Sequence, residues 1–430
     1  MRSTARSATV IGAGQGGLHL ALGLIKDGWR VRLVTNLTPE QYAGAQLMSG
    51  HMLQQRSVLM EQVAGAAPYS SLTAHPARGV DFALSADGRN VDLRFQGDFE
   101  GPALSLDTRL KCSTLLETFR RQGGEVHFGS VGEADLAELA EDGDPVFVAT
   151  GRAGLSSLFD TDEARTVHDR PQRQLLLLLV SGFRPLGEDT EGRVKFCFSP
   201  EHGEIFFGPQ VHLSNTPVHS VFIEARPGGA MDRFREVGSA AEALEIARAL
   251  VSEFAAWELD ALREARPSDP RGWLRGAVTP LVRRPVAALS TGRCVFGVGD
   301  VLMVCDPAAG QGGNATAWGV HDLLAGLREL DGAPVTRDWY EDRFERFWAK
   351  EGRYFAGFSN MLLEPPNAAA ETLFAASARS RAVADRLASC FAHPKVLMEH
   401  LGSVAAAERF IREAEHGVRA RLVGEPPETR

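Results

Sequence analysis

A glycine-rich segment near residue 12 constrains the fold more than any other feature of the chain. The run Ala8–Ile11 leads into the sequence GAGQGG (residues 12–17), which has the form GxGxxG, and a helix-like stretch and a second strand-like run follow it. In a β-α-β unit of this kind Gly12 permits the tight turn, Gly14 lets a pyrophosphate approach the backbone, and Gly17 lets helix and strand pack closely. The first helical turn adds free N–H groups and the positive end of the helix dipole. The segment therefore predicts a Rossmann-type dinucleotide site.

The composition excludes several other classes of protein. Of 430 residues, 44% are hydrophobic and 23% are charged, values typical of a soluble globular chain with two or three structural units. The net charge of −9 argues against a nucleic-acid partner, because such proteins present a basic face. The five cysteines are scattered without CxxC spacing, so neither a disulfide framework nor a metal site is expected.

No targeting or membrane segment is expected either. The first strand-like run begins at Ala8, which leaves no room for a signal peptide before it. The longest apolar run, Leu175–Val180, is far shorter than the roughly 18 residues of a membrane span, and we interpret it as a buried strand. We therefore expect a cytoplasmic protein without a membrane partner.

The pattern along the chain predicts an α/β protein with a Rossmann-type domain, an inserted, mainly β substrate domain and a helical C-terminal region. The expected boundaries are 1–170 for the first part of the Rossmann-type domain, 171–275 for the insertion, 276–335 for the second part of the Rossmann-type domain and 336–430 for the helical region.

Three details of this division can be compared with a structure. Strand-like runs near 80–84 and 91–95 are assigned to the first part of the Rossmann-type domain. A long helix is predicted to begin at Ser239, and its apolar positions keep helical spacing to Leu262. The polar, proline-containing tail Gly424–Arg430 is expected to be disordered.

The end of the second strand-like run lacks a residue that Rossmann-type sites usually have. An acidic side chain normally stands about 20 residues after the glycines, where it binds the adenosine ribose hydroxyls. Here the sequence reads Thr35-Asn36-Leu37, without an acid. Asn36 can offer only a neutral hydrogen bond, which predicts weaker retention of the nucleotide.

Two more motifs follow a late strand-like run. The first is Gly299-Asp300, and the second is the segment 306–312, DPAAGQG, which precedes a helix. An aspartate at a strand end can accept hydrogen bonds from a ribityl chain. A glycine-rich helix start can direct N–H groups at the pyrimidine edge of a flavin, where charge collects on reduction. Together with GxGxxG, the two motifs predict a flavin site.

In this order the three elements resemble those of the FAD-dependent aromatic monooxygenases with the para-hydroxybenzoate hydroxylase fold. Within that fold, three segments are similar to the styrene/indole monooxygenase family: Phe198-Ser199-Pro200-x-His202-Gly203-Glu204, Asp107-x-Arg109-Leu110, and the motif region from Gly299 to Gly312. The resemblance extends from the N-terminus to about Trp348, and a similar helical tail follows.

This resemblance implies the oxygenase component of a two-component flavoprotein monooxygenase. In the family, a separate NADH-dependent flavin reductase supplies diffusible FADH2. The oxygenase captures O2 as a flavin C4a-hydroperoxide and epoxidises or hydroxylates an aromatic alkene, an indole-like substrate or a sulfide. A homodimer is common for the fold. The ending Ala149-Thr150-Gly151 agrees with this, since single-component hydroxylases carry an Asp-Gly pair there that serves both FAD and NADPH.

The resemblance also implies roles for individual residues. Arg109 would pair with the FAD pyrophosphate, unless it is an exposed arginine at a helix start, and the backbone near Val131 would meet the adenine. Ser49 and the backbone at Pro307 would be the catalytic groups that face the flavin and the peroxide. The expected cofactor-binding residues are Gly12, Gly14, Gln15, Gly17, Thr35, Asn36, Gln46, Arg109, Val131, Thr150, Gly151, Asp300, Pro307, Gly310, Gly312, Gly313 and Asn314. The expected substrate pocket is Leu47, Met48, Ser49 and Gly50.

The segment Gln46–Gly50 departs from the family pattern. The family has an Arg-Leu-Leu-Asn-Thr type of segment, and this chain reads QLMSG. A fixed positive charge and some side-chain bulk are lost. We therefore hypothesise a pocket of altered shape, for a substrate other than styrene.

Two alternative functions stay open. A single-component FAD hydroxylase, or a related reductase acting on a prenyl or polyene substrate, would hold FAD tightly and oxidise NAD(P)H directly. A catalytically silent flavin-binding subunit is compatible with the changes at Gln46–Gly50, but the intact motifs between Gly299 and Gly313 argue against it. The sequence does not name the substrate.

Overall fold

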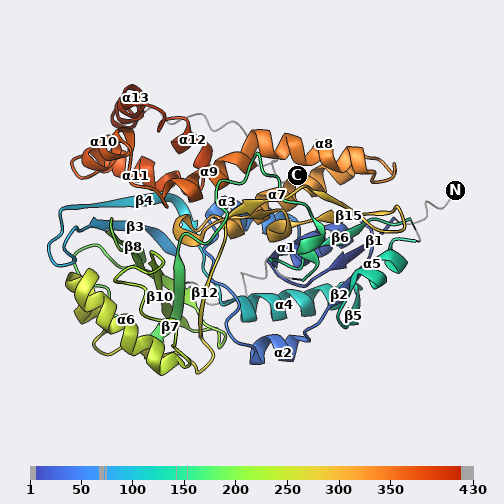
Figure 1. Cartoon of the computed structure of the whole chain (residues 1–430), viewed down its shortest axis with the longest axis horizontal. Helices are drawn as coiled ribbons and strands as arrows, with labels where there is room; N and C mark the ends of the chain where they lie inside the picture. The colour runs from blue at the N-terminus through green and yellow to red at the C-terminus, as the bar shows by residue number, and fades with distance from the viewer. Residues whose placement is uncertain (1–5, 67–71, 73–74, 142, 153, 418–430) are drawn as a thin grey trace.

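The computed structural model describes residues 6–66, 72, 75–141, 143–152 and 154–417, so the predicted disordered tail lies outside the described residues. Two sheets lie side by side, the first to the right of Figure 1 and the second to the left, and the C-terminal helices run along the top of both. The expected α/β class, with a mainly β unit and a helical C-terminal region, is confirmed. Among the described residues, no helix combines the length and the apolar character needed to cross a bilayer.

The first sheet has the Rossmann-type arrangement that the glycine-rich segment predicts. Its strand order is β14-β15-β6-β1-β2-β5, and every neighbouring pair is parallel except β14 with β15. Its strands are β1 (Ser7–Ile11), β2 (Arg30–Thr35), β5 (Glu125–Phe128), β6 (Val146–Val148), β14 (Val286–Ala288) and β15 (Cys294–Gly297). The helices that accompany them are α1 (Gln15–Lys26), α2 (Pro39–Gly44), α3 (Gln55–Val63), α4 (Thr108–Arg121), α5 (Glu133–Leu139), α7 (Gly312–Glu329) and α8 (Arg337–Phe347).

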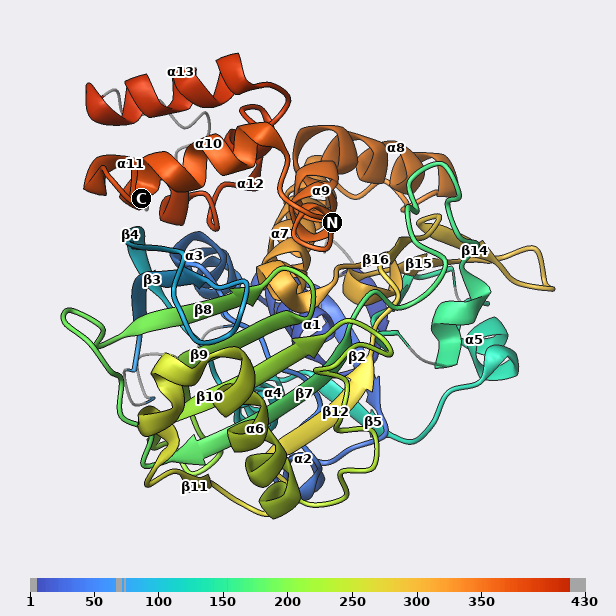
Figure 2. The ribbon, with the colours of Figure 1, turned by 60° about the vertical axis from the view of Figure 1, so that its left-hand side comes forward.

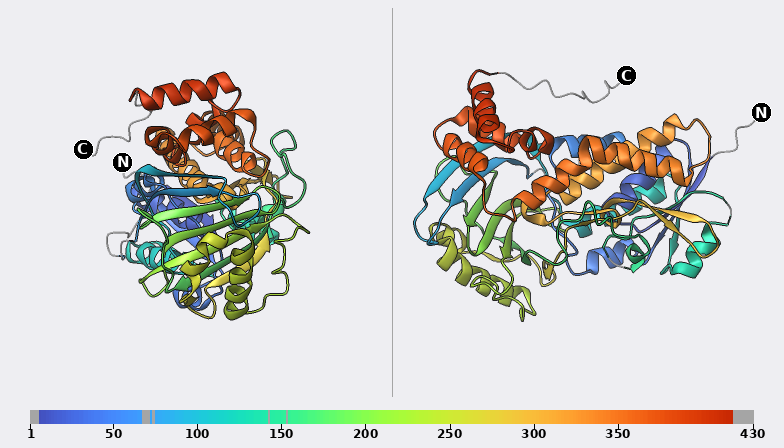
Figure 3. Two further views of the ribbon diagram at one scale, coloured as in Figure 1. Left: turned by 90° about the vertical axis from the view of Figure 1, so that its left-hand side faces the viewer. Right: turned by 45° about the horizontal axis from the view of Figure 1, so that its top comes forward.

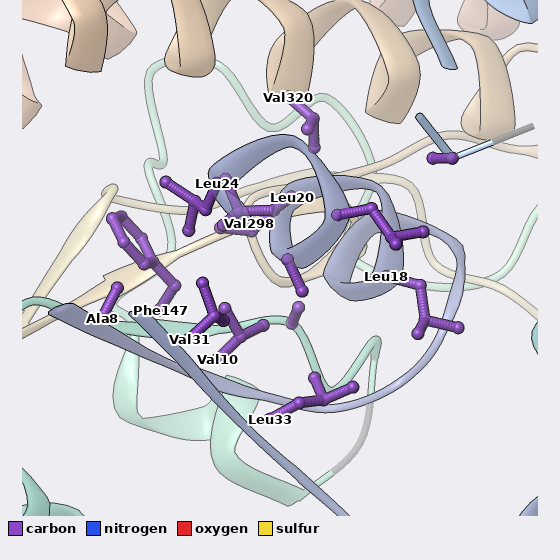
Figure 4. Close-up of a cluster of buried hydrophobic side chains, with 14 of the residues drawn as sticks. Ala8, Val10, Leu18, Leu20, Leu24, Val31, Leu33, Phe147, Val298 and Val320 are labelled. Carbon is purple, nitrogen blue, oxygen red and sulfur yellow. The ribbon is translucent and has the colours of Figure 1, made fainter. Parts of the chain in front are cut away.

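Helix α1 forms because its apolar residues recur at helical spacing and can be buried on several sides. Leu18, Leu20 and Leu24 are completely buried, and Figure 4 shows their side chains gathered with those of the neighbouring strands around Val10 and Val31. α1 also packs against α4 and α7. The first helix is thus held in the centre of the domain, which fixes the direction of its N-terminus.

The second sheet has the order β11-β7-β10-β9-β8-β3-β4, and β12 pairs with β7 along the same edge as β11. Figure 2 shows it with α6 (Ala240–Phe254) lying across its near face. Its strands are β3 (Ala77–Leu84), β4 (Leu93–Ala103), β7 (Gln174–Ser181), β8 (Arg193–Ser199), β9 (Gly203–Val211), β10 (Pro217–Ala225), β11 (Arg266–Pro267) and β12 (Trp273–Ala277). Two short strands, β13 (Leu281–Val282) and β16 (Met303–Val304), pair separately.

The runs near 80–84 and 91–95, expected within the first part of the Rossmann-type domain, form strands of the second sheet. β3 pairs in parallel with β8, so Val80 lies beside Val194, more than a hundred residues further along the chain. Local patterning identifies a strand but not its partner, because the pairing depends on contacts distant in sequence. The other expected boundaries stay a prediction.

The C-terminal helices cover the end of the second sheet and one side of the first (Figure 3). They are the π-helical turn Trp348–Gly352, α9 (Arg353–Met361), α10 (Ala368–Ser377), α11 (Arg381–Ser389), α12 (Pro394–Met398) and α13 (Val404–Glu415). α11 lies along β4, where its Asp385 accepts a hydrogen bond from the Asp98 N–H at 2.7 Å.

The long helix predicted to run to Leu262 ends earlier, at Phe254. Ala255 adopts an extended φ of −152°, and a separate 3-10 turn covers Ala256–Leu262. The break lets Glu258 turn under the sheet, where its Oε1 lies 2.7 Å from Lys195 Nζ. Helical spacing of apolar residues does not reveal this ion pair, which explains the error.

Lys195 is the centre of a buried charge network. Its side chain is 2% exposed, and its Nζ contacts Glu258 Oε1, Asp81 Oδ2 at 3.3 Å and the Leu186 carbonyl at 2.8 Å. Asp81 is shared with Arg94, which donates two hydrogen bonds to it. The four charges balance, so each depends on the others for compensation.

We expect Lys195→Met to destabilise the protein by about 3–5 kcal/mol, because Glu258 would be left as a buried charge without a cation. The measurement is urea unfolding of the whole chain. Lys395→Met is the matched control, since Lys395 is exposed, pairs with Glu399 at 4.0 Å and lies 5.6 Å from the Tyr354 ring centroid, and exposed contacts of these kinds contribute about 0–1 kcal/mol each. Equal losses in the two variants would contradict this account.

Candidate active site

Three segments that are far apart in the sequence meet where the two sheets approach each other: residues 12–17, 46–54 and 299–314. Gln15, at the start of α1, donates its Nε2–H to the Gly313 carbonyl at 3.0 Å, which joins the N-termini of α1 and α7. Gly313 also lies against His51 and Leu53. Two helix N-termini are therefore directed at the same region, as a bound dinucleotide requires.

The glycines of the segment 12–17 are required for different structural reasons. Gly12 has a φ of +106°, and a Cβ there would lie 2.5 Å from the Ala149 carbonyl oxygen. A Cβ on Gly17 would lie 1.9 Å from the Gly12 carbonyl oxygen. A Cβ on Gly14 would meet no atom within 4 Å. Gly12 and Gly17 thus permit close packing, whereas Gly14 faces open space, where a pyrophosphate can approach the backbone.

The loop before α7 has the same open character. Asp306 caps the short turn Pro307–Ala309 through a 3.1 Å hydrogen bond from the Ala308 N–H, and Gly310 follows with a φ of +63°. A Cβ on Gly310 or on Gly312 would meet nothing within 4 Å. The residues present therefore fit a flavin against the N-terminus of α7, as the motif predicts.

Asn314 fixes this loop to the 46–54 segment. Its Oδ1 accepts the Gln54 N–H at 2.9 Å, and its Nδ2 donates to the carbonyls of Met52 and Gly310, both at 3.0 Å. Both amide hydrogens are used within the protein. Asn314 is therefore a link between two loops, and its side chain has no donor left for a cofactor.

The segment Gln46–Gly50 lies against the second sheet. Gln46 donates its side-chain N–H to the Trp273 carbonyl, the Leu47 N–H donates to the Arg271 carbonyl, and a Cβ on Gly50 would contact Leu177. The Ser49 side chain is exposed, and its carbonyl accepts a hydrogen bond from Thr108. A cavity of about 550 Å³ opens beside this segment; its lining includes Gln46, Leu47, Met48, Arg152, Leu175 and Val278.

Arg109 does not have the environment expected of a pyrophosphate partner. Its side chain is 1% exposed, and its Nη2 lies 2.6 Å from Asp107 and 2.8 Å from Asp269. Nη1 donates to Asp269 and to the Ala45 carbonyl, and Nε donates to Asp107. All five N–H groups are directed at protein oxygens, so neither the expected phosphate contact nor the alternative of an exposed arginine is correct. The fixed partners hold the loop before Gln46 in place.

Arg152 is a cation in this region that the sequence reasoning missed. It follows Thr150 and Gly151 at the carboxyl end of β6, its side chain is exposed, and it lines the cavity. Its charge acts on Asp300, whose pKa is raised by burial and lowered again by Arg152 and Arg283. The sequence contains a signal for it, because a basic residue in the loop after a strand of a Rossmann-type sheet is well placed for a phosphate.

The remaining predicted residues lie near the carboxyl edge of the first sheet. Thr35 is buried at the end of β2, and its Oγ1 accepts the Leu37 N–H at 3.3 Å. Asn36 is exposed directly after it, and Val131 is half-buried in the loop between β5 and α5. Their expected contacts with the adenosine end of FAD stay a prediction.

Comparison with known proteins agrees with this architecture. A family model described as "Styrene monooxygenase A putative substrate binding domain" matches residues 151–260. The chain is 28% identical over 323 residues to styrene monooxygenase StyA of Pseudomonas fluorescens, an alignment that covers 71% of this chain and 73% of the relative. The corresponding enzyme of a Pseudomonas species is 27% identical over 327 residues.

Solved structures with the same fold include flavoproteins. A flavoprotein/dehydrogenase from Cytophaga hutchinsonii superposes with a TM-score of 0.64 at 16% identity, covering 96% of this chain and all of that one. The flavin-dependent halogenase CmlS gives a TM-score of 0.61 at 16% identity, covering 85% of this chain and 67% of that one. At these identities the likeness concerns the fold.

The fold, the glycine-rich helix starts and the sequence relatives together define the class of this protein, an FAD-dependent flavoprotein monooxygenase. Within that class, the sequence matches of this chain are to styrene monooxygenases.

We expect Gly14→Ala and Gly17→Ala to affect different properties. Gly14→Ala should leave the melting temperature of the apoprotein unchanged and weaken FAD binding about tenfold, because the methyl group enters the space that the pyrophosphate needs. Gly17→Ala should cost about 3 kcal/mol of stability or more, because the methyl group overlaps the Gly12 carbonyl. Thermal melts and flavin fluorescence titrations measure the two effects. A Gly14→Ala protein with unchanged FAD affinity would contradict the assignment.

Arg152 and Arg109 provide a second comparison of FAD affinity with apoprotein stability. Arg152→Gln should weaken FAD binding by roughly tenfold, the effect of one lost charged contact, and leave apoprotein stability intact. Arg109→Gln should instead destabilise the apoprotein by about 3–5 kcal/mol, since Asp107 and Asp269 lose their cation. If Arg109→Gln folds as well as the parent protein and loses only FAD affinity, Arg109 is the phosphate ligand after all.

Proposed function

We propose that this chain is the oxygenase component of a two-component monooxygenase, which takes FADH2 from a separate NADH-dependent flavin reductase and oxygenates an aromatic alkene or an indole-like molecule. The match of residues 151–260 to the substrate-binding domain of styrene monooxygenase carries this proposal. The overall reaction with an alkene converts FADH2, O2 and the alkene into FAD, water and the epoxide.

Reduced FAD, when bound, supplies the electrons for O2 activation, so the chain's own residues need only bind, orient and exclude water. The groups suited to hold it are the backbone at Gly14, the N-terminus of α7 and the side chain of Arg152. Ser49 and the backbone at Pro307 stay our candidates for the groups that face the reacting atoms.

Part of the cavity lining is apolar, which suits one face of an aromatic substrate, while Gln46, Arg152 and Arg275 line the cavity as polar groups. Leu47, Leu177 and Leu179 form a buried cluster, and Phe222 packs against it from the next strand. Leu175 and Val278 continue this surface into the cavity beside Met48. Burial of an aromatic ring on such a surface is favourable in proportion to the area removed from water. We therefore place the substrate in the cavity beside Leu47 and Met48, along Leu175 and Val278.

Two features support an exchangeable flavin. Asn36 stands where an acidic residue would bind the ribose, and it is exposed. The strand β6 is followed by Thr150-Gly151-Arg152, without the aspartate of single-component enzymes. Weak retention of the nucleotide is the property that a protein supplied by diffusion requires.

The experiment mixes the apoprotein anaerobically with FADH2 and then adds oxygenated buffer with styrene, indole or a sulfide. We expect oxygenated product without any NAD(P)H. In a second assay, in which the protein is mixed with oxidised FAD and NAD(P)H but no reductase, we expect no oxidation of NAD(P)H. Asn36→Asp is the matched control: it restores the acid and should retain FAD about tenfold more tightly, since it adds one charged hydrogen bond. Direct oxidation of NAD(P)H by the chain alone would instead indicate a single-component enzyme.

A further inference from the structure

A group of buried charges lies where the second sheet faces the loop Asp306–Gly312. Arg173 precedes β7, Glu204 is on β9, Glu224 is on β10 and Asp306 begins the loop. Their exposed fractions are 2%, 4%, 0% and 1%, respectively. Three carboxyl groups therefore share one buried guanidinium.

The hydrogen bonds join two of these groups and, within the described part of the chain, leave Glu224 without a donor. Arg173 donates from Nε and Nη2 to the two oxygens of Glu204, both at 2.8 Å, which is the geometry of an ionised bidentate pair. Asp306 uses Oδ1 to accept the Ala308 N–H. Among the described residues, both oxygens of Glu224 and Oδ2 of Asp306 have no hydrogen-bond donor.

A proton on Glu224 would supply the hydrogen-bond donor that these carboxyl oxygens lack. Two buried carboxylates cannot both stay ionised side by side without a cation, whereas a neutral carboxyl group can donate its O–H to the other. The charged groups that face Glu224 are Asp306 and Glu204, which raise its pKa, and Arg173, which lowers it. Burial is the largest effect and moves the pKa of Glu224 well above its usual range, while burial raises the pKa of Asp306 to about 6.

We propose that Glu224 and Asp306 hold one proton between them, and that this carboxyl–carboxylate hydrogen bond fixes the loop Asp306–Gly312 against the second sheet. Glu224 is then a positioning residue, which acts on the flavin through the loop. This second role rests on the proposed function, because it requires that the loop holds the flavin. Loss of the proton places two like charges in contact, so flavin binding weakens as the pH rises.

The apoprotein tests the shared proton without any cofactor. Because the folded-state pKa of Glu224 is raised above 4.5, the stability linked to this proton is fully present below about pH 4.5 and is lost as the pH rises toward the folded-state pKa. Glu224→Gln is neutral at every pH and avoids this loss. We expect its melting temperature to match that of the parent protein near pH 5 and to exceed it by about 2–4 °C at about pH 8.

The control is Glu258→Gln, which removes a buried glutamate on the other face of the same sheet. Glu258 is paired with Lys195, so this substitution should lower the melting temperature at neutral pH. If Glu224 were ionised and compensated by Arg173, Glu224→Gln would behave in the same way, and the proposal would be overturned. Infrared spectra give a second readout: the carbonyl stretch of a protonated carboxyl should disappear in Glu224→Gln and persist in Glu258→Gln.

Flavin titrations test the positioning role separately. Glu224→Leu cannot donate to Asp306 and should bind FAD about tenfold more weakly at neutral pH, whereas Glu224→Gln should bind like the parent protein and lose its decline in affinity at alkaline pH. Should the infrared band be present while neither variant alters FAD binding, the positioning role is wrong and the shared proton stands. If the melting temperatures and the infrared spectra agree with the shared proton but no substrate is oxygenated, the proposed function is wrong and the shared proton stands.

Discussion

The side-chain amide of Asn314 joins the parts of the molecule on which the site depends. Three hydrogen bonds connect the start of α7 with Met52, Gln54 and Gly310. The loop before α7 and the segment 46–54 come from opposite ends of the chain, and neither has a regular ladder to hold it. Because each bond satisfies a buried backbone group, an alternative arrangement would leave polar groups without partners. The space between the loops is therefore defined before any ligand enters.

The sequence predicts those parts of this arrangement that have a local physical cause. The glycines at 12, 14 and 17 are constrained by a turn, a phosphate approach and a helix contact within one unit, and the structure assigns the close contacts to Gly12 and Gly17 as predicted. The parallel pairing of β1 with β2 follows from the same β-α-β unit. The cap at Asp306 and the left-handed Gly310 are likewise local features of a tight turn before a helix.

What the sequence does not predict are partners distant along the chain. Nothing near Arg109 shows that Asp269, 160 residues later, will occupy its guanidinium. The pairing of β3 with β8 and the break in the helix at Ala255 have the same origin, since each depends on a contact made only in the folded state. Arg152 differs, because its position after the end of β6 is a local feature that the sequence itself contains.

The flavin site must meet two requirements at once, exchange of the nucleotide and a fixed loop to receive it, and buried charged groups meet the second. Under the proposed function a loosely held nucleotide has to enter and leave. The loop that receives it must still be ordered, because a disordered loop would have to be ordered again at each binding event. Arg109 and Asn314 meet the second requirement with contacts that need no ligand. In the proposed pair of Glu224 and Asp306 the same requirement is met with a proton, which makes the contact conditional on pH, whereas Arg173 and Glu204 are joined by a bidentate ion pair. A site built in this way can weaken its hold on the nucleotide at Asn36 without loosening the walls of the reaction space.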